Sequence, residues 1–217
     1  MVAREDWVRV GLGVLAREGA PGVTIERLTG ELGVSKGSFY HHFKGAGGFK
    51  TALLEYFETQ NTRRLMDAVE EDPTAAGVVK LHRLLELILD DSRGYDLEIA
   101  IRAWALQDDE VRAAQERVDR TRTDYLEGLC REILKDRRSQ RESQRESPKG
   151  REREKERESR KDRESAAGVE TGEAAHLARL LYLILIGAGQ VVPGVPRDEL
   201  RAIYAMTLRL SIGETAL

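Results

Sequence analysis

The stretch that most constrains this chain is residues 24–44, where two short helical patterns are separated by a glycine. Thr24 is a good N-cap, and it precedes three apolar residues that recur on one helix face: Ile25, Leu28 and Leu32. Gly33 then supplies the left-handed backbone that ends a helix at low cost, and Ser35 predicts the start of a second helix. Two short helices that meet at a tight turn form a helix-turn-helix unit.

The second helix is predicted to have one apolar and one polar face. Phe39 and Phe43 are four residues apart and share the apolar face, which we assign to the core. Basic, aromatic and hydrogen-bonding residues occupy the other directions, as in a helix that enters the major groove of DNA. The candidate DNA-binding residues are Thr24, Ser35, Lys36, Gly37, Ser38, Tyr40, His41, His42 and Lys44.

Residues 33–43, which read GVSKGSFYHHF, together with the preceding Thr24-Ile25 and Leu28-Thr29, resemble the DNA-binding signature of the TetR family of bacterial transcriptional regulators. The resemblance implies a three-helix DNA-binding head and an all-helical body for ligand binding and dimerisation. It also implies repression that a small molecule relieves. The chain departs from the family at Gly45–Gly48, where a polar cap and a phosphate-gripping basic residue are usual. Lys44 or Lys50 could replace that phosphate contact.

Metal binding and catalysis are not supported by the residue pattern. His41 and His42 are adjacent and point in different directions on a helix, with no Cys or carboxylate at ligand spacing. Cys130 and His82 lack a third orienting residue and an oxyanion element. We therefore expect no enzyme, no metal and no cofactor.

Charge and cysteine content bound the partners and the compartment. The net charge is −3, but residues 35–50 carry three lysines and no acidic residue, so positive potential is expected where DNA would bind. A single cysteine suits a reducing cytosol. No signal segment and no apolar run of membrane-spanning length is present, so we expect a cytoplasmic protein.

The remaining apolar periodicities predict further helices. Trp7, Val10, Val14 and Leu15 form the stripe of a first helix, which ends at residues 18–22. One long helix is expected over about residues 48–70, joining the head to the body. Body helices are expected from Val78 to Leu89, from Leu97 to Leu106 after a break at 92–94, and from Val111 towards Leu134.

Residues 136–165 differ from the rest of the chain. They contain twelve basic and nine acidic residues and no aliphatic or aromatic side chain, so they have no apolar surface to bury. We interpret this segment as a charged insert, and as a flexible linker rather than a second DNA-binding tail, because its net charge of +3 is small.

Two C-terminal segments predict the subunit contact. Residues 174–192 are apolar almost all round, and residues 198–212 carry a long apolar stripe. A helix that is apolar all round, as over 174–192, must be buried on two sides, which favours a second subunit. The two segments also resemble the dimerisation pair of the TetR family, which implies a homodimer built on a four-helix bundle; the alternative is a core hairpin of a monomer. Four amphipathic side chains are candidates for an effector pocket: His82, Tyr95, Trp104 and Tyr125.

The sequence thus predicts an all-α protein with a helix-turn-helix head over residues 1–47 and an effector-binding and dimerisation body over residues 48–217. We expect a dimeric repressor of a palindromic operator, released by a small-molecule effector. Two alternatives stay open. One is a protein of the same fold without a small-molecule effector, and the other is a helical ligand-binding protein or enzyme with a vestigial head.

Overall fold

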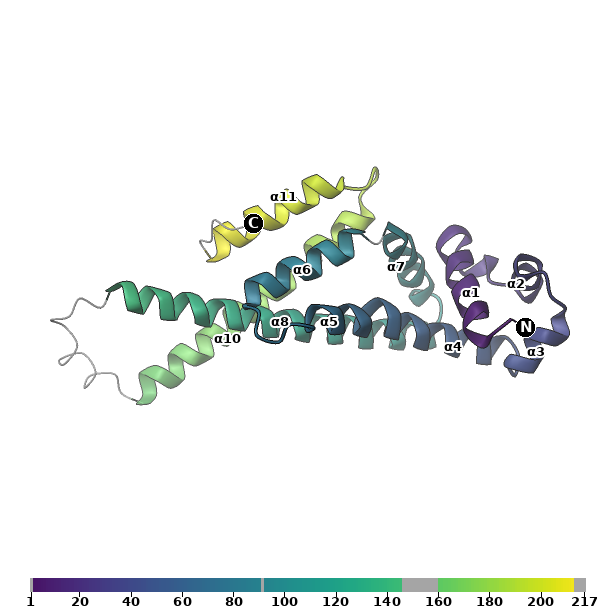
Figure 1. Cartoon of the computed structure of the whole chain (residues 1–217), viewed down its shortest axis with the longest axis horizontal. Helices are drawn as coiled ribbons and strands as arrows, with labels where there is room; N and C mark the ends of the chain where they lie inside the picture. The colour runs from purple at the N-terminus through teal and green to yellow at the C-terminus, as the bar shows by residue number, and fades with distance from the viewer. Residues whose placement is uncertain (1, 91, 146–159, 213–217) are drawn as a thin grey trace. The chain divides into compact units, whose positions relative to one another are not determined.

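The computed structural model describes residues 2–90, 92–145 and 160–212, and it is all-helical over these residues (Figure 1). The all-α prediction is therefore confirmed. In chain order the helices are α1 (Arg4–Glu18), η1 (Ala20–Gly22), α2 (Ile25–Leu32), α3 (Lys36–His42), α4 (Ala46–Glu58), η2 (Thr59–Arg63), α5 (Arg64–Val69), α6 (Gly77–Asp90), α7 (Ser92–Ala105), α8 (Asp109–Arg145), α10 (Arg160–Gln190) and α11 (Arg197–Ile212).

The chain divides into two compact units, and the division falls within α6 and α8. Unit 1 comprises Met1–Glu71 and Glu86–Arg122, and unit 2 comprises Asp72–Leu85 and Thr123–Leu217. The head predicted over residues 1–47 lies wholly in unit 1. Helices α4 and α7 belong to the same unit, and α7 contacts α1.

An aromatic cluster forms the centre of unit 1. Trp7 is fully buried, and its ring meets that of Phe39 edge-on with a centroid separation of 5.4 Å. Phe43 and Phe49 complete the cluster at a centroid distance of 5.0 Å. The same apolar core continues into α7 and α8 through Ile101 and other buried side chains. The head helices and α7 therefore share one core.

The two helices of the predicted helix-turn-helix unit are α2 and α3. Gly33 ends α2 with φ 65° and ψ 33°, the left-handed conformation expected from the sequence. Helix α3 is shorter than predicted, because it ends at His42 and Phe43 is extended, with φ −134° and ψ 141°. The N–H of Phe43 still donates to the carbonyl of Phe39 at 2.9 Å, and both rings stay in the core as predicted.

The long helix predicted over residues 48–70 is a continuous helical run with an irregular centre. It begins at Ala46 and ends at Val69, and Thr59–Arg63 adopt the wider π-helical turn. Arg122 of α8 binds this turn, donating to the Thr62 hydroxyl at 3.1 Å and to the Asn61 carbonyl at 3.2 Å. Periodicity does not reveal a π turn, because the apolar spacing on either side of it is unchanged.

Three body boundaries differ from the prediction. Helix α7 begins at Ser92 rather than at Leu97, so Gly94 lies inside a helix that tolerates it. Helix α8 extends to Arg145, and α10 begins at Arg160. The charged insert predicted over 136–165 is therefore helical at both ends, where Arg, Glu and Gln are good helix formers. Its centre, residues 146–159, lies outside the described residues.

Unit 2 contains α10, α11, the start of α6 and the later part of α8. Gly77 packs closely on α8, since a Cβ added there would lie 3.1 Å from the carbonyl oxygen of Leu129. Helices α10 and α11 contact each other, and the buried Tyr204 hydroxyl donates to the carbonyl of Leu181 at 2.6 Å. Each of these two helices thus has one face fixed in the core of unit 2.

The packing of α1 on α4 generates a stability prediction at Gly11. A Cβ at this position would lie 2.6 Å from the Phe49 ring and 3.1 Å from Leu53, both of which are buried. We expect Gly11→Val to lower the free energy of unfolding by about 1–3 kcal/mol through overpacking. Urea denaturation followed by tryptophan fluorescence measures this, because Trp7 and Trp104 both lie in unit 1.

Gly30→Val is the matched control. A Cβ at Gly30 meets nothing within 4 Å on the exposed surface of α2. Equal stability of the two variants would contradict the close packing of α1 on α4.

Candidate nucleic-acid interface

Helix α3 presents an exposed polar face on a fixed base. Its apolar side is anchored by Phe39, which is fully buried, whereas Tyr40 is 60% exposed. Lys36 and Gly37 are exposed in the first turn, and Ser38 is half-buried. The first turn and the tyrosine therefore stand on a helix that the aromatic cluster holds in place.

The other predicted contact residues surround this face. Ser35 is the exposed N-cap of α3, but its hydroxyl makes no capping hydrogen bond; its carbonyl accepts from the N–H of Ser38 at 3.0 Å. His41 and Lys44 are exposed, and His42 is half-buried 6.4 Å from the Trp7 ring centroid. Thr24 instead caps α2, where its hydroxyl accepts from the N–H of Arg27 at 3.1 Å.

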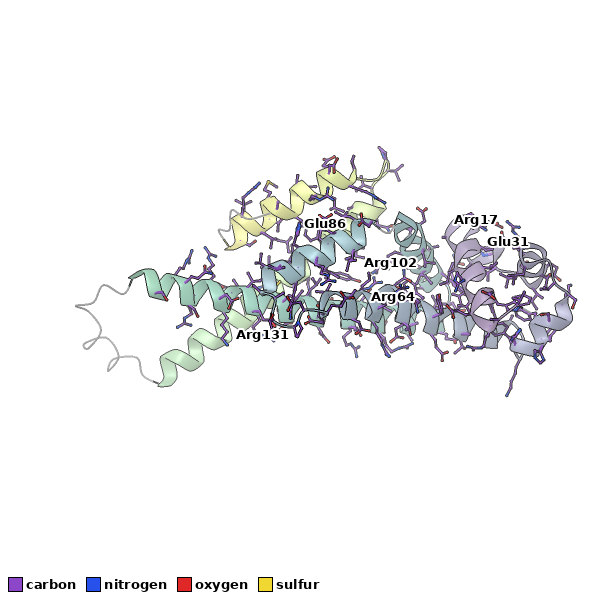
Figure 2. The ribbon with its side chains drawn as sticks, viewed as in Figure 1. Arg17, Glu31, Arg64, Glu86, Arg102 and Arg131 are labelled. Carbon is purple, nitrogen blue, oxygen red and sulfur yellow. The ribbon has the colours of Figure 1, made fainter. Side chains whose placement is uncertain are left out.

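Ion pairs fix α2 on α1. Arg27 donates to Glu18 at 2.6 Å, and Arg17, labelled in Figure 2, donates to Glu31 at 2.7 Å. The hydrogen bond from Arg27 holds the pKa of the Glu18 carboxyl below its ordinary value, although desolvation opposes the shift. These exposed links join α1 to α2, the helix that precedes the turn into α3.

Carboxylates pair with two of the three lysines on which the expected positive potential depended. Lys36 forms an exposed ion pair with Glu26, whose hydrogen bond raises the pKa of the Lys36 ammonium. Lys50 is 2.8 Å from both Asp108 and Glu110, with 23% of its side chain exposed. The predicted charge excess is thus smaller than residues 35–50 suggest, because both sets of partners come from other parts of the chain.

The Gly45–Gly48 run forms the start of α4. Gly45 is the N-cap, with φ 115°, and it offers no side-chain cap. The first N–H groups of a helix have no partner within the helix, and they carry partial positive charge. Ala46, Gly47 and Gly48 are exposed. Backbone N–H groups therefore lie at the position where the family resemblance implies a basic side chain that binds phosphate.

The four candidate pocket residues are divided between the two units, with Tyr95 and Trp104 in unit 1 and His82 and Tyr125 in unit 2. Trp104 of α7 is half-buried and lines a pocket of about 440 Å3 within unit 1, together with head residues. His82 has an exposed side chain on α6, and Tyr125 is half-buried on α8. The side chain of Tyr95 lies outside the described residues. The sequence did not indicate that Trp104 would lie against the head.

The thiol of Cys130 is shielded from solvent. Cys130 is fully buried, and desolvation raises the pKa of its thiol to about 12, so the reactive thiolate is disfavoured. Among the described residues there is no cluster of three or more His, Cys, Asp or Glu side chains that could hold a metal ion. Within those same ranges, no helix is long and apolar enough to cross a membrane.

Comparison with known proteins finds a family similarity in the first part of the chain. The profile of bacterial regulatory proteins of the tetR family matches residues 8–57. The transcriptional regulator AcuR of Cereibacter sphaeroides is 32% identical over 80 residues, which cover 37% of this chain and 36% of that protein. The uncharacterised regulator YerO of Bacillus subtilis is 29% identical over 69 residues, 32% of this chain and 24% of that protein. The matched region thus spans about a third of the length of AcuR and about a quarter of the length of YerO.

Two solved structures share the fold over nearly the whole chain. One, provisionally named a transcriptional regulator of the TetR/AcrR family, matches with a TM-score of 0.66 and 18% identity, covering 94% of this chain and 97% of its own. The other, provisionally named a transcriptional regulator from Pseudomonas aeruginosa PAO1, has a TM-score of 0.64 and 17% identity, with 97% and 90% covered. At this identity the likeness concerns the fold alone.

The pairing of Lys50 generates a prediction for stability against pH. Hydrogen bonds raise the pKa of the Lys50 ammonium, with the one to Asp108 contributing most and the one to Glu110 next. In return, Lys50 lowers the pKa of both carboxyls. The pairing should stabilise unit 1 fully at pH values above the ordinary carboxyl pKa values of 3.8 (Asp108) and 4.5 (Glu110) and below the ordinary lysine pKa of 10.5. It is lost as pH falls through the lowered carboxyl pKa values, or rises through the raised lysine pKa.

We therefore expect Lys50→Met to destabilise unit 1 by roughly 0.5–1 kcal/mol at neutral pH and by less in acid. Urea denaturation at about pH 7 and about pH 3, followed by tryptophan fluorescence, measures the difference. Lys135→Met, on the exposed surface of α8, is the control. A loss of stability that did not change with pH would show that Lys50 acts through packing alone.

Proposed function

We propose that this chain is a member of the TetR family of bacterial regulatory proteins, and that it is a cytoplasmic, DNA-binding transcriptional repressor that acts as a dimer and is released by a small-molecule effector. The family is one of regulators and not of enzymes. The observation that carries the proposal is the exposed face of α3, held on a buried aromatic base inside the region that matches the family profile.

The residues of the interface would have different roles. Gly37 lets the backbone approach the major groove, and Ser38 reaches a base edge or a phosphate. Tyr40 and His42 donate to phosphate oxygens, and Lys36 reaches phosphate when it leaves Glu26. Backbone N–H groups at the start of α4 would bind a further phosphate, since a helix N-terminus favours an anion. Lys44 is exposed and can add a charge contact.

Exposed apolar stripes on α10 and α11 support the dimer. Leu180 and Leu183 are 45% and 60% exposed on α10, three residues apart. Met206 and Leu210 are 48% and 80% exposed on α11, four residues apart. The opposite sides of both helices are already buried in unit 2. Pairing these stripes with a second copy would remove them from water, as in a four-helix bundle across a two-fold axis.

Release by an effector is supported by the continuity of unit 1. The head and α7 share one apolar core, so a ligand that moves α7 also moves the recognition helix. A two-fold dimer binds two half-sites at a fixed spacing, and an effector that prefers another spacing lowers DNA affinity by linkage.

Removing side chains from the α3 face should weaken sequence-specific binding. We expect Tyr40→Ala and Lys36→Ala each to weaken binding to DNA from upstream of this gene by about fivefold to a hundredfold, because each removes a charged or hydrogen-bonding contact. Salt-titrated fluorescence anisotropy, with a scrambled duplex for comparison, measures both affinity and specificity.

The control for the α3 variants is Lys135→Ala, which removes an exposed lysine from α8. Unchanged affinity in both α3 variants would overturn the proposed interface. Equal binding of wild type to the native and scrambled duplexes would leave only non-specific electrostatic binding and would contradict the regulator proposal.

A charge placed in the stripes should prevent dimerisation. We expect Leu183→Glu and Leu210→Glu to be monomeric in sedimentation velocity at concentrations where wild type is dimeric, since each places a carboxylate in an apolar interface. Leu106→Glu is the matched control, because Leu106 is 81% exposed on a different part of the chain. A dimer that persists in both stripe variants would place the subunit contact elsewhere.

A further inference from the structure

The pocket of about 440 Å3 lies between the head helices and Trp104, entirely within unit 1. Its walls come from α2, α3 and α4, together with the segment that precedes α2 and the end of α7. Its volume falls in the range of small-molecule sites, about 300–1,000 Å3. We propose that this pocket is a second ligand site, distinct from an effector cavity in the body, and that it binds a small neutral aromatic molecule with one hydrogen-bonding group.

The walls explain the preference for an aromatic ligand. Trp104 is the half-buried aromatic residue of the lining, and the buried rings of Phe39 and Phe49 lie beneath the accessible wall, with their centroids 5.5 Å apart. Val23 and Ile25, both half-buried, add aliphatic surface. Flat rings gain from edge-on and offset contacts with such side chains in addition to the area they bury.

The charge around the pocket explains the preference for a neutral ligand. Lys50 is the charged lining residue, and its ammonium is 2.8 Å from both Asp108 and Glu110. Two carboxylates against one ammonium leave a net charge of about −1, so a ligand carboxylate would be repelled. An ammonium has three N–H donors, and its two carboxylate partners leave one that a ligand hydroxyl or carbonyl could accept.

The wall at Trp104 is tied to the same ion pair. The carbonyl of Trp104 accepts from the N–H groups of Gln107 at 2.9 Å and Asp108 at 3.1 Å. One short turn therefore carries both an aromatic wall of the pocket and the carboxylate that binds Lys50. A ligand that contacts Trp104 would act on this turn.

Phe39, the buried anchor of α3, underlies the opposite wall. Binding in the pocket would then be coupled to the position of the recognition helix, and the coupling would be reciprocal. This last step rests on the proposed DNA-binding function. Ligand binding itself does not.

The test uses 2-naphthol as the probe and 2-naphthoate as its anionic counterpart, titrated into the full-length protein by calorimetry in the absence of DNA. We expect saturable binding of 2-naphthol at one site per chain, with 2-naphthoate at least about fivefold weaker because of the carboxylates near Lys50. No saturable binding of 2-naphthol would overturn the site, and equal or tighter binding of 2-naphthoate would overturn the ligand class.

Two variants locate the probe. Gly47 lines the pocket, and a Cβ there meets nothing within 4 Å, so Gly47→Leu should fill the space and weaken binding by about tenfold or more. Gly30→Leu adds the same side chain to the open surface of α2 and should leave the affinity unchanged. Trp104→Ala, which removes an aromatic wall without filling the pocket, should also weaken binding. Full affinity in Gly47→Leu and Trp104→Ala would place the probe elsewhere.

The DNA arm is separate. If 2-naphthol binds, its effect on affinity for the upstream duplex tests the coupling. If the protein binds 2-naphthol but does not bind the upstream duplex selectively, the proposed function is contradicted and the ligand site is not. If the protein binds the duplex selectively but does not bind 2-naphthol, only the ligand site is contradicted.

Discussion

Edge-on packing of aromatic rings beneath α3 is the constraint on which the rest of unit 1 depends. Trp7 comes from α1, Phe39 and Phe43 from α3 and its C-cap, and Phe49 from α4, and their contacts decide where α3 can lie. Gly11 leaves the room that Phe49 needs against α1. Because the cluster holds α3 from one side only, its other side is open for recognition. Stability and recognition therefore use opposite faces of one seven-residue helix.

The same core makes the head part of a larger cooperative unit. Buried side chains of α7 and of the start of α8 belong to the apolar cluster that contains Trp7. Part-buried polar contacts lie beside it: Arg122 donates to Glu98 at 2.8 Å and to the carbonyl of Asn61, in the π-helical turn, at 3.2 Å. A change in α7 would alter packing around α3, because densely packed side chains transmit displacement.

Sequence periodicity predicted the helices well where an apolar stripe meets a clear stop signal. Thr24 and Gly33 cap the two ends of α2 as predicted, because capping depends on local residues. Phe43 was placed inside α3 because its spacing from Phe39 is helical, but spacing does not show whether the backbone has already become extended. The ion pairs of Lys50 with Asp108 and Glu110 could not be foreseen, since about sixty residues separate the partners. Trp104 was a reasonable pocket candidate, but its neighbours come from the tertiary fold.

The pairing of Lys36 with Glu26 affects how the protein would meet DNA. Because carboxylates already match two of the three lysines in residues 35–50, few condensed cations would be displaced from a duplex on first contact. Long-range attraction would then be weak, and the chain would carry an internal competitor for phosphate at the recognition surface. Exposed ion pairs are weak in water, so a phosphate could exchange with Glu26 at little cost once the helix is seated. Such a surface would distinguish DNA sequences after contact, through the fit of α3 in the groove. Its complexes with unrelated sequences would be short-lived.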